Sequence, residues 1–119
     1  MSSTEIPPPN ALARSSELAR GHWDACAERL RAALAAGEDP AVPRPVTHTV
    51  ALPSPEAADL FAEVAGVRGF TCKMQPGPEG TVHVRATRTD AIGLPHIHNV
   101  VMELTEFAAP YDGDHVGLG

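Results

Sequence analysis

Hydrophobic and polar residues follow two different periods along this chain, and each period predicts one kind of element. In three segments the apolar side chains recur at steps of three and four residues. Such steps bring side chains to one face of an α-helix, so we expect three amphipathic helices. The first is expected over residues 16–37, with Trp23 anchoring it to the rest of the domain. The second begins after the cap residue Ser54, and the third is expected over residues 94–109.

Strict alternation of apolar and polar residues predicts the strands. In the segment 46–52 the apolar positions share one side with His48, and the threonines share the other. Segments 70–75 and 81–87 alternate in the same way around the sequence PGPEG, which is typical of a hairpin loop. The last residues leave room for one short strand. The predicted order after the first helix is therefore β-α-β-β-α-β.

This order is the split βαβ plan of an α+β, ferredoxin-like sandwich, here with an additional N-terminal helix. Right-handed crossovers would place the two later helices on one face of the sheet. We expect the ferredoxin-like domain over residues 45–119 and a flexible tail over residues 1–15, which include three consecutive prolines. The expected core consists of Val46, Val50, Leu52, Leu60, Phe61, Val64, Phe70, Met74, Val82, Val84, Ile97, Val101 and Leu104.

The sheet face away from the helices is the candidate binding surface. Alternation places Lys73, His83 and Arg85 there, beside threonines and Gln75, so that a local basic patch forms in an acidic protein. The face has no Phe, Tyr or Trp on which bases could stack, which argues against direct binding of nucleic acid. The residues leave open a face that only contacts water, or one that pairs sheet to sheet in a homodimer.

Charge and composition narrow the class of protein. The formal net charge is −6, from 15 acidic and 9 basic residues, which disfavours a nucleic-acid backbone as partner and suits a basic protein segment. Cys26 and Cys72 lie on different predicted elements without a CxxC spacing, and we expect both to be reduced. The chain lacks a secretion signal and an apolar run long enough to span a membrane, so we expect a cytoplasmic protein.

No set of residues predicts catalysis. The serines and cysteines occupy cap, core or tail positions, without the base and orienting group that a nucleophile requires. His96 and His98 are two residues apart, so on a helix they point away from each other and cannot share a metal ion. His48 shares its face with apolar residues and is expected to be a hydrogen-bonded core histidine. We therefore predict no catalytic residue, no cofactor and no metal.

Residues 37–117 resemble a known family in order and spacing. The segment THTVALPSPEAADLFAEVAGVRGF, the hairpin, the third helix and YDGDHVG are similar to the domain of regulator of ribonuclease activity B, the ribonuclease E inhibitor family. The matching positions are His48, Phe61, Ala62, Gly69, Phe70, Tyr111, Asp112 and Gly113. Asp114 stands where the family usually has tryptophan. The resemblance implies a ferredoxin-like fold, an acidic surface and binding to the scaffold region of the ribonuclease.

Two hypotheses of different classes follow. The first is a non-catalytic, protein-binding regulator whose partner is ribonuclease E or a similar RNA-processing enzyme. The predicted partner-binding residues are Lys73, His83, Arg85, Tyr111, Asp112 and Gly113. The second is a ferredoxin-like homodimer that encloses a small ligand or substrate between its sheets.

Overall fold

The computed structural model describes the backbone of residues 9–119 and the side chains of residues 21–119. This part of the chain contains three α-helices and one four-stranded antiparallel sheet, which confirms the α+β class. The helices are α1 (Pro9–Ala35), α2 (Pro55–Val67) and α3 (His96–Ala108). The strands are β1 (Arg44–Leu52), β2 (Thr71–Pro76), β3 (Val82–Asp90) and β4 (Asp114–Leu118). Two short 3-10 turns, η2 (Pro78–Gly80) and η3 (Ala109–Tyr111), precede β3 and β4.

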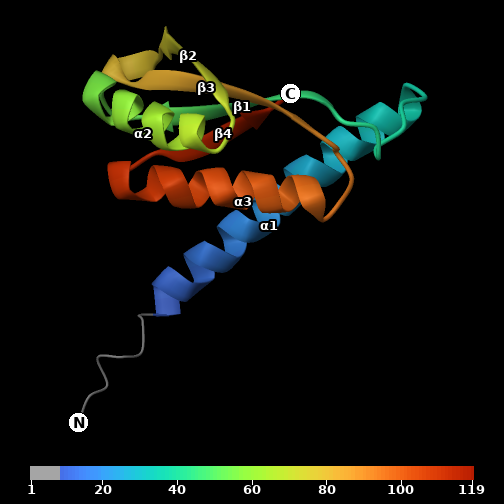
Figure 1. Cartoon of the computed structure of the whole chain (residues 1–119). Coiled ribbons are helices and arrows are strands. Elements are labelled where there is room, and N and C mark those ends of the chain that lie inside the picture. Colours follow the sequence, from blue (N-terminus) through green and yellow to red (C-terminus); the bar gives the residue numbers. More distant parts are fainter. Residues whose placement is uncertain (1–8) are drawn as a thin grey trace.

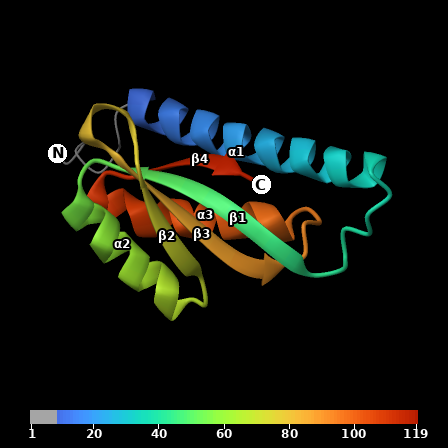
Figure 2. The same ribbon diagram turned by 90° about the horizontal axis from the view of Figure 1, so that it is seen from above.

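The sheet has the strand order β2-β3-β1-β4, and each neighbouring pair is antiparallel. Helices α2 and α3 pack on one face of the sheet, and the opposite face has no helix over it (Figure 1). In the view from above, the strands lie in front of both helices, and α1 runs alongside β4 (Figure 2). Helix α1 packs against α3 and β4, so it docks on the same domain.

The start of α2 follows directly from its sequence. The Ser54 side chain accepts a hydrogen bond from the Ala57 backbone N–H at 3.2 Å, and Pro55 occupies the first turn. A serine cap satisfies a backbone donor that has no partner inside the helix, and proline tolerates the first turn because its missing N–H is not needed there. The predicted cap at Ser54 is therefore confirmed.

Alternation along the two central strands sorts their side chains as predicted. In β1, Val46, His48 and Val50 are fully buried, while the threonines between them are half-buried. In β3, Val84 and Ala86 are fully buried, while Arg85 between them is exposed. The buried side of the sheet packs beneath α2 and α3, which places the core there.

Two residues of the predicted core are exposed, and two more, Val64 and Val82, are only half-buried. Leu60 is 46% exposed and Met74 is 43% exposed. The buried line of α2 runs through Ala58, Phe61 and Ala65, so Leu60 lies about 100° around the helix from Phe61 and faces outward. Met74 is exposed because β2 is an edge strand of 6 residues, over which the helical layer gives little cover.

Ile92 is a core residue that the sequence pattern did not predict. It lies between β3 and α3 in a segment without periodicity, yet its side chain is fully buried. Its backbone N–H donates to the carbonyl of Pro40 at 3.1 Å, which ties this segment to the connection that enters β1.

The first helix is longer than predicted. Helix α1 begins at Pro9 instead of near residue 16, so residues 9–15, which we expected in the tail, belong to the helix. The remainder of the predicted tail lies outside the described residues. Cys26 and Ala33 are fully buried against the domain, and the Trp23 ring meets the His98 ring edge-on at 5.0 Å. Trp23 therefore contacts the domain as predicted, although 40% of it stays exposed.

Candidate functional site

The uncovered sheet face, hereafter the open face, is a shallow hollow built from β1, β2 and β3. Its volume is about 540 Å³, and its lining residues are Thr47, Thr71, Lys73, Gln75, Arg85 and Thr87. Thr47 and Thr87 are cross-strand partners whose hydroxyl oxygens are 2.9 Å apart, and Thr71 pairs with Thr87 on its other side. A row of threonines thus crosses three strands at one end of the hollow.

Two cations stand directly opposite each other in the hollow. Lys73 on β2 is the cross-strand partner of Arg85 on β3, and both side chains are exposed. Lys73 is the sole lysine of the chain. Among residues 21–119, neither side chain forms an ion pair, whereas Arg44 and Arg88 pair with carboxylates. The structure therefore brings these two predicted site residues together and leaves their charges unneutralised.

His83 lies on the same strand but is held by the hairpin loop. It pairs with Gln75 across the strands and is only half-exposed. A Cβ atom at Gly77 would lie 2.9 Å from His83 Cδ2 and 2.4 Å from Thr81 Oγ1, so the loop backbone packs closely over both side chains. His83 borders the hollow and is less free to reach a partner than Lys73 or Arg85.

Tyr111, Asp112 and Gly113 form a tight turn into β4, the edge strand on the far side of the sheet from β2. Asp112 has a positive φ of 57°. A Cβ atom at Gly113 would approach Leu52 Cδ1 to 2.6 Å and Ala108 Cβ to 2.9 Å. These contacts give the turn a packing role. Its predicted role in partner binding stays a prediction, at a place apart from Lys73 and Arg85.

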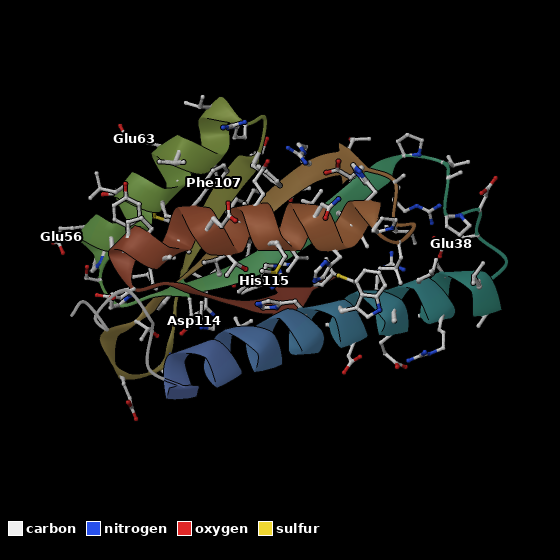
Figure 3. The ribbon with its side chains drawn as sticks, turned by 90° about the horizontal axis from the view of Figure 1, so that it is seen from below. Glu38, Glu56, Glu63, Phe107, Asp114 and His115 are labelled. Carbon is white, nitrogen blue, oxygen red and sulfur yellow. The ribbon has the colours of Figure 1, made fainter. Side chains whose placement is uncertain are left out.

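A chain of histidines lies where α1 meets the domain, and the sequence analysis did not connect them. The His48 and His115 rings are 5.3 Å apart between centroids, and the His115 and His22 rings are 5.5 Å apart. His48 Nδ1 lies 3.0 Å from His115 Nε2, so the predicted hydrogen bond of the core histidine His48 is confirmed. Figure 3 shows His115 on β4, between α3 and α1.

One hydrogen bond links the two most deeply buried rings of the chain of histidines. The His48–His115 contact joins two ring nitrogens, so one of the two neutral rings donates and the other accepts. The other ring nitrogen of His48, Nε2, is buried and has no hydrogen-bond partner within the part of the chain that the structure describes.

Burial keeps these histidines uncharged. Desolvation lowers the pKa of His48 to about 4, against an opposing effect of the Asp90 carboxylate. Desolvation, together with repulsion from His48 and His22, lowers the pKa of His115 to about 3. Burial and the nearby His98 lower the pKa of His22, which Asp114 partly offsets. The chain of rings is therefore a neutral, packed element of the α1 junction.

The two cysteines are also buried or half-buried. Cys26 and Cys72 are free thiols, and burial raises the pKa of Cys26 to about 11 and also raises the pKa of Cys72. Across residues 21–119, no three histidine, cysteine, aspartate or glutamate side chains are arranged to hold a metal ion.

None of the helices in the described part of the chain has the length and hydrophobicity that a bilayer-spanning helix needs.

An apolar hollow of about 470 Å³ adjoins the loop end of β2, and it also escaped the sequence analysis. Its lining includes Pro55, Met74, Pro76 and Val82. The sequence did not reveal this hollow because alternation assigns Met74 to the core. Only the position of β2 at the edge of the sheet shows that Met74 is exposed.

Fold and site together define a class of small α+β proteins in which helices cover one face of an antiparallel sheet and leave a polar face free for contact. The family model described as regulator of ribonuclease activity B, RraB, matches residues 23–119. The chain therefore belongs to the RraB family, as its sequence motifs indicated. A comparison with curated proteins found no match.

Proposed function

We propose that this protein is a non-catalytic regulator that binds a ribonuclease in the cytoplasm, the partner being ribonuclease E or a similar RNA-processing enzyme. Membership of a family of ribonuclease regulators supports this function. We also propose that the fold is ferredoxin-like, which the strand order β2-β3-β1-β4 and the all-antiparallel pairing support.

The observation that carries the proposal is the open face. A sheet that is covered by helices on one side only must solvate its other side or give it to a partner. Here that side presents Lys73 and Arg85, two exposed cations without carboxylate partners among the described residues, in a protein of net charge −6. We propose Lys73, Arg85 and, at the rim, His83 as contact residues.

The embedded state of the reactive groups supports a non-catalytic role. A nucleophilic cysteine needs a lowered pKa, whereas burial raises the pKa of Cys26 and of Cys72. A histidine general base needs a pKa near the working pH and access to substrate, whereas His48 is fully buried and burial lowers its pKa to about 4.

Adding the purified protein to ribonuclease E should slow the cleavage of an RNA substrate in a saturable way. Calorimetry on the same two proteins should give a stoichiometric complex. Heat-denatured protein is the control. A ribonuclease that neither binds the protein nor changes its cleavage rate at saturating concentrations contradicts the proposed function.

A second candidate function is a homodimer that holds a small ligand between its open faces. The observation that favours it is the size of the hollow, since about 540 Å³ lies within the range of small-molecule sites. Light scattering separates the two candidates. A protein that stays monomeric at high concentration rules out the homodimer. A dimer that dissociates when Arg85→Glu reverses the charge of the open face favours it.

A further inference from the structure

We propose that the open face binds an acidic, extended segment of the partner protein, whose carboxylates are held between Lys73 and Arg85. This inference rests on the proposed function, because it names the chemistry of the partner at the same surface. The inference rests on the local positive charge of the open face, although the net charge of the whole protein is negative.

The placement of the two cations carries the inference. Directly opposite residues on one face of an antiparallel pair have Cβ atoms about 5 Å apart, and like charges at that separation destabilise the pair. Lys73 and Arg85 are such a pair, and none of the residues that line the hollow is acidic. A carboxylate placed between the two side chains would turn this repulsion into two charge-assisted hydrogen bonds.

Several acidic side chains among residues 21–119 lie away from the hollow or already have partners. Glu56 and Glu63 lie on α2, on the helix side of the molecule, and Asp114 lies on the edge strand near α1 (Figure 3). Asp90 is already engaged by Arg88 and His96. Among residues 21–119, no carboxylate pairs with Lys73 or Arg85, so both cations are available to the carboxylates of a partner.

A peptide segment fits this face better than RNA does. Single-stranded RNA is held by aromatic side chains that stack on its bases, and no aromatic residue lines the hollow. RNA also brings one charge per nucleotide toward a protein of net charge −6, whereas an acidic segment brings a few carboxylates to one place. The threonine row across the hollow offers hydroxyls that can bond to the carbonyl and N–H groups of an extended backbone.

Charge reversal tests the inference on the full chain. Lys73→Glu and Arg85→Glu should each weaken the binding of ribonuclease E by about tenfold or more at low ionic strength, because attraction becomes repulsion. Lys73→Arg should keep the affinity. Arg31→Glu is the matched control, since it makes the same change of net charge at an exposed position on α1, and it should leave the affinity nearly unchanged.

Stability measurements separate lost binding from lost folding. Each reversal at Lys73 or Arg85 replaces a like-charge pair by an ion pair, so the thermal midpoint should stay equal or rise while the affinity falls. If wild type binds and both reversals bind as tightly as Arg31→Glu, the inference is wrong and the proposed function survives.

A ribonuclease that does not bind at all overturns the proposed function, and a second probe then decides the inference. A short synthetic peptide of alternating glutamate and serine, titrated into labelled protein, should shift the NMR amide signals of Lys73, Arg85 and the threonine row. Shifts that are absent, or that map to the helix side, overturn the inference. So does a single-stranded RNA oligonucleotide that occupies the open face more tightly than this peptide.

Discussion

Acidification from about pH 7 to about pH 5 is expected to destabilise the fold by roughly 2 kcal/mol for each of His48 and His115. Burial lowers the folded-state pKa of His48 to about 4 and that of His115 to about 3. Both values lie below the unfolded value of about 6.5, so the unfolded chain binds more protons in this window. The stability that these rings contribute is complete above about pH 6.5 and is lost as the pH falls toward the folded-state values.

Urea unfolding at a series of pH values measures this loss. His115→Gln removes one titrating ring and keeps an amide group that can donate to or accept from His48 Nδ1, so it should flatten the dependence on pH by about half. His83→Gln, outside the histidine chain, is the comparison variant for the loss of one histidine elsewhere in the fold. An unfolding free energy that does not change between the two pH values would show that these rings are not held neutral by burial.

Gly113→Ala should destabilise the protein by about 1–3 kcal/mol, the usual cost of overpacking a tight site. The added Cβ would lie 2.9 Å from Ala108 Cβ and 3.3 Å from the Ala51 carbonyl oxygen, neither of which can rotate away. The approach of 2.6 Å to Leu52 Cδ1 also forces a core side chain to move.

Gly66→Ala is the matched control for this substitution. Gly66 lies in α2, and a Cβ there would meet nothing within 4 Å, so alanine should leave stability unchanged or raise it by up to about 1 kcal/mol. Thermal unfolding of both variants gives the comparison. Equal midpoints for the two variants would contradict the close packing of the turn.

The two central strands were predictable because both of their faces obey a simple rule. A residue of β1 or β3 is either under the helices or away from them, so alternation alone separates Val84 from Arg85. The same rule failed for Met74, since alternation does not reveal that β2 is an edge strand. It failed for Leu60 because two neighbouring helical positions, 60 and 61, can each complete an apolar stripe, and only packing chooses between them.

The candidate site was also predictable in part. Alternation gave the face on which Lys73 and Arg85 lie, but their direct opposition depends on the hairpin register, which the loop sets. The histidine chain could not be found from the sequence, because His22, His48 and His115 come from three elements that meet only when α1 docks. The prediction that His48 is a hydrogen-bonded core histidine was therefore correct, but the sequence did not reveal that His115 is its partner.

Zero-length crosslinking at Lys73 tests the central claim most directly. Because Lys73 is the sole lysine, a carbodiimide can join the protein to a partner carboxylate only through Lys73 Nζ or the terminal amine. Peptide mass spectrometry of the crosslinked complex with ribonuclease E should find an amide bond between Lys73 and an aspartate or glutamate of the ribonuclease, and Lys73→Arg should abolish it without loss of binding. A stable complex in which Lys73 stays unlinked, while crosslinks form only at the terminal amine or through this protein's own carboxylates, would contradict the account.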